Sequence, residues 1–523
     1  MKVNPNYNKN GNYVYPPGPR EIFPYSLAIK FISNPLPILK EIADSYGDIS
    51  HFRFGPKLHV YLINDPYLIE NILVKHNKYF VKSPGLQLAK RVIGNGLITN
   101  EGESHSKQRR IVQQAFTKEK VKIYGNIITE HCIEYANANW KDGMIVNIHK
   151  EMTKLTLSII SKLLFGNSAL TLNEIDKISD HITLIIDYIN KLRLPFLRFI
   201  ERLPIPLTLE YKKALNQLDN IIYSKIDLQR KKTPIIESKK ISKLEINNTK
   251  LRKQNDFQNY QSESDILSVL ISLTHKEVTN KNEQLLLEKA KGQKEEISKM
   301  TDKQLRDEVM TIFLAGHETT ANALTWTLYL LSRHPKMESK ILDEINIVND
   351  EKEDDGRNRK IITVEDLSRL KYTEKVLMES MRLYPPSWAI GRQTIQDYSL
   401  NEKYSIPSGS VIIMSQYLMH HDVRYFSDPE KFIPERWSPK FKASMPRFSY
   451  FPFGGGPRSC IGEPLAWIEG IIVLANIINN WKITLEEKDI ANIKLQPLVT
   501  LRPKNGIRMK ISKRSDTKSN NEF

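Results

Sequence analysis

The chain contains two cysteines, and one of them, Cys460, lies within the glycine-rich stretch FPFGGGPRSCIG. A thiolate binds metal more readily than a thiol, and it forms where the surroundings favour negative charge. The segment after Cys460 has apolar residues at helical spacing, which predicts a helix whose amino-terminal amides face the sulfur. Arg458 adds a positive charge two residues away. A metal ligand and an ordinary buried thiol are the two interpretations of Cys460 at this point.

The glycines of this stretch would let a large flat ligand approach the backbone beside the sulfur, because glycine has no side chain. They are Gly454, Gly455, Gly456 and Gly462. No histidine flanks the loop to complete a structural zinc site, or to serve as the base of a cysteine nucleophile.

A second candidate is AGHETT, Ala315 to Thr320, in the middle of a long apolar segment. Glycine inside a helix is about 1 kcal/mol less favourable than alanine. The flanking residues are apolar on nearly every helical face, so the polar residues indicate a site rather than a solvated turn. Glu318 and Thr319 are side chains able to handle protons there.

Charged residues at helical spacing form two further motifs. Glu379 and Arg382, in EKVLMESMRLYPP, share one face of a predicted helix, and Arg436 follows in FIPERW. An exposed pair of this kind contributes only about 0.3 kcal/mol. In EGESHSKQRR, His105 and Arg109 lie four residues apart, so they also share a face.

The order and spacing of these motifs resemble the cytochrome P-450 family. Phe453, Gly456, Arg458, Cys460 and Gly462 match all five fixed positions of its haem-binding loop. The resemblance extends from PPGPR near the N-terminus to PLVTLRPKNGIRMKI near the C-terminus. It implies haem b as the cofactor, with Cys460 as its iron ligand, and dioxygen as a co-substrate.

The resemblance also implies roles for individual residues. Thr319 would hydrogen-bond dioxygen, Glu318 would help to deliver protons, and Ala315 would leave room for oxygen and substrate. Four residues would neutralise the haem propionates: Arg109, Arg392, Arg458 and His105, which stands where the family usually has tryptophan. Phe453 and Gly454 belong to the cofactor-binding loop. Glu379, Arg382 and Arg436 would form a buried cluster that retains the haem loop without taking part in catalysis.

The implied activity is that of a haem-thiolate monooxygenase acting on an apolar substrate, such as a fatty acid, carotenoid, terpenoid or other lipid. No flavin or ferredoxin segment is recognised, so electrons from NAD(P)H would arrive through a ferredoxin or flavodoxin-type donor and its reductase. Residues 80–98, Ala315, residues 388–390 and Val499 would surround the substrate. A peroxide-dependent member of the family and a non-catalytic haem sensor are the alternatives.

Composition limits the possible partners and the location. The net charge is +17, but lysines are spread along the chain and no nucleic-acid-binding motif is present, so we expect no nucleic acid. The first thirty residues lack the roughly 18–20 apolar residues of a spanning helix. We expect a cytoplasmic monomer. The segment 192–207 mixes basic and apolar residues and could contact a membrane surface peripherally.

The elements that must position these residues are predominantly helical. Apolar periodicity predicts helices near residues 35–46, 68–75, 108–116, 152–164, 209–226 and 301–332, and a hairpin turns at Gly55-Pro56. We therefore expect a mainly α fold with small β-sheets and a long central helix crossing the haem. The expected organisation is an arm at 1–20, one domain at 21–511 with charged insertions at 231–260 and 276–297, and a flexible tail at 512–523.

Overall fold

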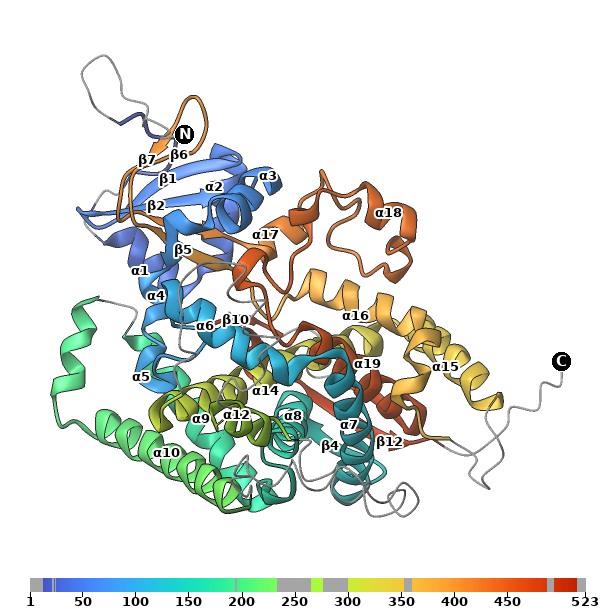
Figure 1. The fold of residues 1–523 in the computed structure, drawn as a ribbon. Helices are drawn as coiled ribbons and strands as arrows, with labels where there is room; N and C mark the ends of the chain where they lie inside the picture. The colour runs from blue at the N-terminus through green and yellow to red at the C-terminus, as the bar shows by residue number, and fades with distance from the viewer. Residues whose placement is uncertain are drawn as a thin grey trace, which may run out of the picture.

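The computed structural model describes residues 13–20, 23, 25–192, 195–232, 265–275, 300–351, 360–486 and 493–514. Most of these residues are helical, and the strands form small sheets at the margins of the helical body (Figure 1). The predicted fold class, mainly α with small β-sheets, is confirmed.

The described α-helices share the body of the molecule with a few short π and 3-10 turns. In chain order they are α1 (Ser26–Ser33), α2 (Pro35–Tyr46), α3 (Pro66–Glu70), α4 (Pro84–Gln87), α5 (Lys90–Ile93), α6 (Gly102–Gln113), α7 (Lys118–Asn139), α8 (Ile148–Phe165), α9 (Leu172–Lys191), α10 (Pro206–Lys232), α12 (Ile266–His275), α14 (Asp302–Arg333), α15 (Pro335–Asp350), α16 (Lys371–Leu383), α17 (Gln416–His420), α18 (Pro439–Ser444) and α19 (Glu463–Asn480).

Four small sheets complete the described fold. The largest has the strand order β1-β2-β8-β5-β3, and the others pair β4-β12-β9, β10-β11 and β6-β7. Their bounds are β1 (Ile49–Phe54), β2 (Leu58–Ile63), β3 (Phe80–Lys82), β4 (Met144–Asn147), β5 (Ile390–Thr394), β6 (Tyr398–Ser399), β7 (Ser405–Ile406), β8 (Val411–Met414), β9 (Trp481–Leu485), β10 (Leu495–Pro497), β11 (Leu501–Pro503) and β12 (Arg508–Lys513).

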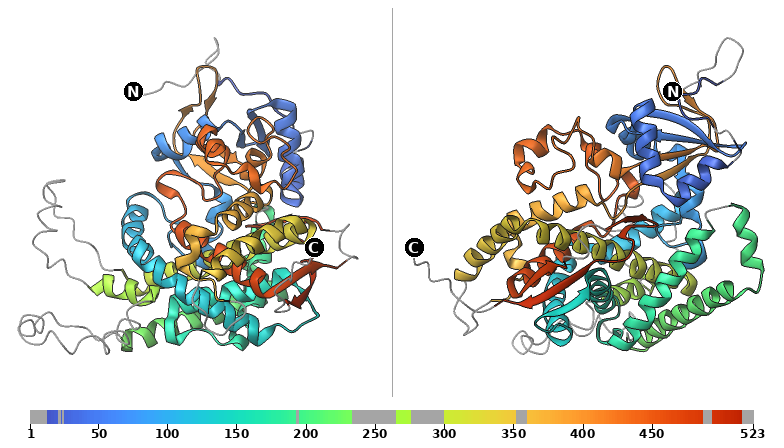
Figure 2. Two further views of the ribbon diagram at one scale, coloured as in Figure 1. Left: turned by 90° about the vertical axis from the view of Figure 1, so that its right-hand side faces the viewer. Right: turned by 180° about the vertical axis from the view of Figure 1, so that it is seen from behind.

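The five-stranded sheet joins segments that lie far apart in the chain. β1 and β2 form the predicted antiparallel hairpin, and β2 then pairs in parallel with β8, which lies some 350 residues later. Seen from in front and from behind, these strands lie at the N-terminal end of the molecule, beside the helical body (Figures 1 and 2). Pairing between distant segments therefore connects the two parts of one fold.

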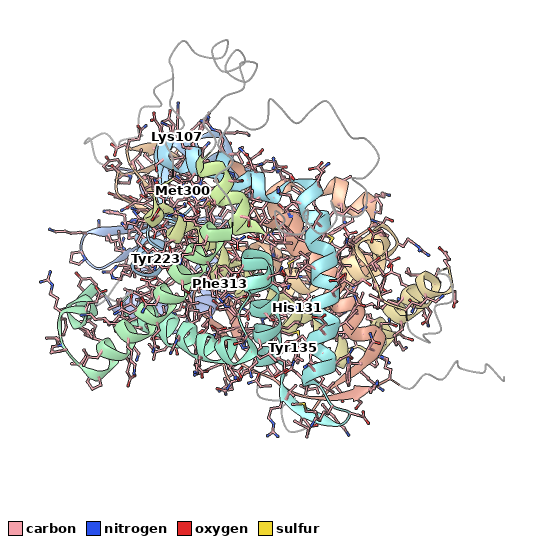
Figure 3. All side chains as sticks on the ribbon, turned by 60° about the horizontal axis from the view of Figure 1, so that its bottom comes forward. Lys107, His131, Tyr135, Tyr223, Met300 and Phe313 are labelled. Atoms are coloured by element: carbon pink, nitrogen blue, oxygen red, sulfur yellow. The ribbon has the colours of Figure 1, made fainter. Side chains whose placement is uncertain are left out.

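The long helix α14 forms the centre of the helical body. It begins with a capping box in which Thr301 and Gln304 bond each other's backbone amides, and it is buried along most of its length. It contacts α8, α16 and α19. Phe313, labelled in Figure 3, packs against Phe165 of α8 with ring centroids 6.2 Å apart. The predicted long central helix is thus confirmed.

Three predicted boundaries need comment. α10 runs to Lys232 and α12 covers Ile266–His275, and most of both predicted insertions lies outside the described residues. β12 continues to Lys513, so Ser512 and Lys513 are paired with β9 and do not belong to a tail. None of the helices in the described ranges is long and apolar enough to cross a membrane.

Candidate functional site: the Cys460 loop and the face of α14

The Cys460 loop is closed by its own backbone. The amide of Cys460 donates to the carbonyl of Phe453 at 2.9 Å, and the Ser459 amide donates to Gly456 at 3.0 Å. α19 begins at Glu463 with Gly462 as its N-cap, so Cys460 lies just before the predicted helix. The loop thereby presents an accessible thiol at the start of α19.

The protonation of this thiol depends on opposing effects. Although Cys460 has exposed surface, the protein atoms packed around its sulfur desolvate it and raise its pKa, and the charge of Glu463 adds to this. The backbone amides of Gly462 and Glu463 and the positive charge of Arg109 oppose the rise without cancelling it. Within the described residues, no three histidine, cysteine or acidic side chains gather to hold a metal ion. Cys460 is therefore suited to be the single protein ligand of a metal whose other ligands come from a cofactor.

The prediction that the glycines make room for a flat ligand is wrong for Gly455 and Gly456. A Cβ on Gly456, whose φ is +70°, would lie 2.1 Å from the Leu73 carbonyl oxygen, and one on Gly455 would lie 2.5 Å from the Phe448 ring. These positions are small because the loop packs closely on the protein itself. Gly454, with φ of +72° and only Ile390 nearby, has the positive φ that favours glycine.

Most of the predicted cationic residues gather beside this loop. Arg109 donates from Nη1 to the Ser459 carbonyl at 2.9 Å. Arg458 donates to the Asn100 carbonyl at 3.0 Å and pairs with Glu101. Burial and the charge of Arg458 lower the pKa of Arg392 to about 10. Burial and the neighbouring cations lower the pKa of His105 to about 3, so this imidazole is neutral near pH 7.

The structure adds Lys82, which the sequence motifs did not identify. Its Nζ donates to the carbonyls of Leu97 and Asn100 at 2.9 and 3.0 Å. Burial and then the charge of Arg458 lower its pKa to about 7. The alternation of side chains along a strand could have indicated Lys82. It places Lys82 on the same side of β3 as Phe80, and both residues are buried.

The charges of this cluster are incompletely balanced. The positive charge of Arg458 opposes the protonated forms of Lys82 and Arg392. The carboxylate of Glu101 favours the charged forms of all three cations, and that of Glu308 favours the charged form of Lys82. Burial lowers the pKa of all three side chains, and the charge of Arg458 lowers it further for Lys82 and Arg392. Two added carboxylates would relieve this excess. The residues present therefore fit a cofactor that carries a pair of propionates.

AGHETT occupies the accessible part of α14. Every residue from Leu305 to Leu331 is buried apart from Leu314, Ala315, Gly316, Glu318 and Thr319. His317 points away, since its Nδ1 contacts the Phe313 carbonyl and it is buried. Thr319 Oγ1 donates to the Ala315 carbonyl at 2.9 Å. The two polar side chains singled out from the sequence thus lie on one accessible face.

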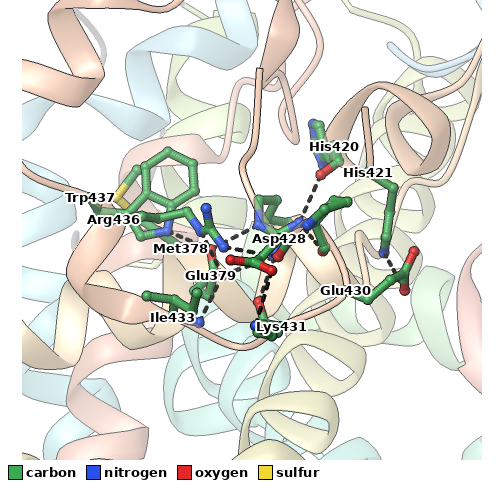
Figure 4. Close-up of polar contacts among 12 residues, drawn as sticks. Met378, Glu379, His420, His421, Asp428, Glu430, Lys431, Ile433, Arg436 and Trp437 are labelled. Atoms are coloured by element: carbon green, nitrogen blue, oxygen red, sulfur yellow. Dashed lines mark hydrogen bonds and ion pairs between the residues drawn. The ribbon is translucent and has the colours of Figure 1, made fainter. Parts of the chain in front are cut away.

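The predicted ion-pair cluster is present (Figure 4). Glu379 and Arg382 are fully buried, and Arg436 is half-buried. Arg382 forms a two-pronged contact with Glu379, at 2.9 Å for both hydrogen bonds, and Arg436 Nε donates to Glu379 Oε1 at 2.9 Å. Trp437 Nε1 donates to the other carboxylate oxygen at 2.9 Å. Arg382 also donates to the His420 carbonyl, and His420 Nε2 accepts the Phe451 amide. The cluster is therefore linked to the start of the Cys460 loop.

The residues predicted to surround the substrate differ in how far they are exposed. Val499 is 54% exposed, and Ile390 is half-buried beside Gly454. Trp388 is buried, and its Nε1 donates to the Leu498 carbonyl at 3.1 Å. In the segment 80–98, Phe80 belongs to β3 and Ile98 is half-buried. Trp388 therefore anchors the segment that carries Leu498 and Val499.

A helical fold, an accessible thiol in a closed loop and a buried cationic cluster beside it define a haem-thiolate protein. The family model described as Cytochrome P450 matches residues 16–511, and the chain belongs to this family. It is a cytochrome P450 monooxygenase, and hence an oxidoreductase that uses haem and dioxygen.

Two bacterial relatives and one solved structure illustrate this membership. Cyclooctatin synthase of Streptomyces melanosporofaciens is 28% identical, over 90% of this chain and 89% of the relative. Cyclooctat-9-en-7-ol 5-monooxygenase of the same organism is 29% identical, over 86% of this chain and 85% of the relative. Retinoic acid-bound cyanobacterial CYP120A1 has the same fold, with a TM-score of 0.74, 23% identity and coverage of 96% and 100%.

Proposed function

We propose that this enzyme inserts one oxygen atom from dioxygen into an apolar organic substrate, with electrons supplied by a separate redox partner. The observation that carries the proposal is the accessible face of α14, which presents Glu318 and Thr319 in an otherwise buried helix. When bound, haem supplies the iron centre that activates dioxygen.

In this proposal Cys460 is the iron ligand and the surrounding loop holds it in place. Arg109, Arg392, Arg458 and Lys82 hold the propionates through charge-assisted hydrogen bonds. His105 donates one ring N–H to a propionate, a role open to a neutral imidazole. Phe453 packs against Trp467, with ring centroids 5.6 Å apart, and so orients the loop at its other end.

Glu318 and Thr319 are the proposed catalytic pair. The Thr319 hydroxyl can release its bond to Ala315 and donate toward dioxygen, and Glu318 can supply a proton from the same face. Ala315 and Gly316 keep that face free of bulky side chains. This pair favours dioxygen over peroxide as the oxidant.

The substrate is proposed to be a hydrocarbon-rich compound of the terpenoid class, in preference to a fatty acid or a carotenoid. Leu314, Ile390 and Val499 offer apolar surface near the proposed catalytic face. The relatives named for cyclooctatin and cyclooctat-9-en-7-ol support this class, since their match covers most of both chains.

Electrons are proposed to come from NAD(P)H through a reductase and a ferredoxin or flavodoxin-type carrier. Such carriers are acidic, and exposed basic residues such as Lys107 and Arg110 lie on α6, the helix that also carries Arg109. A cytoplasmic, monomeric enzyme that binds no nucleic acid suits this arrangement. Phe199, which is 59% exposed, supports a peripheral contact of the 192–207 segment with a membrane surface.

The decisive experiment is turnover with NADPH, a surrogate ferredoxin and its reductase under ¹⁸O₂. The panel contains cyclooctat-9-en-7-ol, lauric acid and β-carotene, and we expect a product carrying one ¹⁸O atom from at least the first compound. Product that forms with hydrogen peroxide but not with NADPH would favour the peroxide-dependent alternative. Haem-loaded protein that gives no product under either condition would favour the sensor.

A further inference from the structure

Glu318 is held by a residue from a distant part of the chain. Thr500 Oγ1 donates to Glu318 Oε1 at 2.6 Å, and 182 positions separate the two residues. Thr500 lies in the tight turn between β10 and β11 and is 6% exposed. A short hydrogen bond from a buried hydroxyl to a carboxylate oxygen is of the stronger, charge-assisted kind.

The direction of this bond is fixed by a second one. Asn322, one turn further along α14, donates from Nδ2 to Thr500 Oγ1 at 3.0 Å. The Thr500 oxygen accepts this hydrogen bond from Asn322. Its own proton is therefore directed to Glu318. Asn322 Oδ1 in turn contacts His149 Nε2 of α8 at 3.1 Å. Burial and then the charge of Arg502 lower the pKa of His149 to about 4, so His149 donates as a neutral imidazole.

The turn that carries Thr500 is anchored on three sides. Trp326 Nε1 donates to the Leu501 carbonyl at 3.0 Å, and the Leu501 amide donates to the Pro386 carbonyl at 2.9 Å. Trp388 Nε1 donates to the Leu498 carbonyl. Because the backbone of this turn is already fixed, the Thr500 hydroxyl loses little conformational entropy when it orients Glu318.

The titratable groups of this network come from four elements. His317 precedes it on α14, His149 lies on α8, and Arg502 lies on β11, where Asp187 of α9 binds it at 3.0 Å. An amide nitrogen cannot accept and pass on a proton as water does, so Asn322 interrupts any direct proton path from His149. The chain of contacts therefore conveys orientation and not protons.

We propose that Thr500 is a positioning residue for the reaction, which holds the Glu318 carboxylate in one orientation and is itself oriented by Asn322. The inference rests on the acid role proposed for Glu318. Val499, the exposed neighbour of Thr500, lies among the proposed substrate contacts. The same turn therefore carries both a proposed substrate contact and the residue that holds Glu318.

The test compares Thr500→Val with Thr500→Ser in the haem-loaded protein. The infrared carboxylate band of Glu318 is assigned by difference from Glu318→Gln. We expect the band to shift in Thr500→Val and to return in Thr500→Ser, which restores the hydroxyl. Thr325→Val is the matched control, because Thr325 is buried on the same helix but donates to its own helix at the Ala321 carbonyl.

The functional readout is hydrogen peroxide released per NADPH consumed, with cyclooctat-9-en-7-ol as the probe. Loss of a hydrogen bond to a charged group predicts about a tenfold rise in Thr500→Val and little change in Thr500→Ser or Thr325→Val. An unshifted band, or equal damage from valine and serine, would overturn the inference. If the band shifts but Glu318→Gln releases no more peroxide than wild type, the acid role of Glu318 fails and this inference with it.

Discussion

At the scale of single residues, the cationic cluster is the part of the site whose charge is least balanced. Lys82 illustrates the physical consequence. Its ammonium group is buried beside two arginines, and its pKa falls to about 7 because burial and like charge both oppose the protonated form. Two of its three donors bond backbone carbonyls, which leaves one for an added carboxylate.

Lys82→Met should therefore weaken haem retention. Loss of one charge-assisted hydrogen bond predicts roughly a tenfold faster transfer of haem to apomyoglobin. Lys78→Met, which removes an exposed lysine from the preceding turn, is the control and should leave the rate unchanged. Equal rates for wild type and Lys82→Met would remove Lys82 from the set of propionate partners.

Sequence motifs identified the site residues whose amino-acid type is fixed by the chemistry. They did not identify the residues whose role depends on contacts between distant parts of the chain. Cys460, Arg109 and Arg458 belong to spaced patterns and are brought together in the structure. Lys82 belongs to no such pattern, and its importance follows from burial. Thr500 lies 182 positions from Glu318 in the sequence, and no local periodicity could indicate that contact.

At the scale of elements, the buried Glu379 cluster fixes α16 to the segment that leads into the Cys460 loop. Both oxygens of Glu379 accept hydrogen bonds, and Arg382 bonds three backbone carbonyls with its remaining donors. Such a cluster is stable only when complete, because each partner would otherwise be a buried unpaired charge.

Arg436→Met should lower the free energy of unfolding by about 3–5 kcal/mol, the usual cost of breaking a buried ion pair from one side. Urea denaturation of the haem-loaded protein measures this change. Lys40→Met is the control, since the Lys40–Asp44 pair is exposed on both sides and should cost less than about 1 kcal/mol. A cost for Arg436→Met as small as that of the control would contradict the structural role.

Glu469, a buried residue of α19, predicts how the stability of the folded protein depends on pH. It is 3% exposed, its Oε1 has no hydrogen-bond partner in the described part of the chain, and burial raises its pKa to about 8. The folded protein therefore binds a proton that the unfolded chain, with the usual glutamate pKa of about 4.5, has released. Stability should fall as pH rises from about 4.5 to about 8.

Glu469→Gln mimics the protonated form and should remove this pH dependence. Relative to wild type it should be stabilised by on the order of 3 kcal/mol at pH 7 and hardly changed near pH 4.5. The measurement is the urea midpoint at both pH values, with the exposed Glu365→Gln as control. A stabilisation independent of pH would show that the carboxylate of Glu469 is not the cause.

Helices and turns were predicted more successfully than the contacts between distant segments. The 35–46 helix, the hairpin at Gly55 and the long helix from Thr301 follow from periodicity and turn residues, which act locally. The parallel pairing of β2 with β8 and the packing of Gly456 on Leu73 depend on distant partners. Local patterns carry no record of such contacts.

At the scale of the whole molecule, the net charge of +17 bears on how electrons arrive. Lys107, labelled in Figure 3, is an exposed residue of α6, the helix that bonds the Cys460 loop through Arg109. A carrier docking on this face would bring its redox centre close to the thiolate side of the haem.

Lys107→Glu should slow electron transfer from an acidic ferredoxin and weaken its dependence on ionic strength. Stopped-flow reduction at low and high salt measures both effects, and Lys213→Glu on α10 is the control. Rates that are indifferent to ionic strength in the wild type would contradict electrostatic docking of the carrier.

The central claim, that Cys460 is the thiolate ligand of a haem iron, is tested most directly by the difference spectrum of the reduced protein with carbon monoxide. Wild type should show the red-shifted Soret band typical of thiolate ligation, and Cys460→Ala should lose it, while Cys132→Ala, which removes the buried second cysteine, should retain it. A folded, haem-containing wild type without that band, or a Cys460→Ala variant that keeps it, would contradict the account.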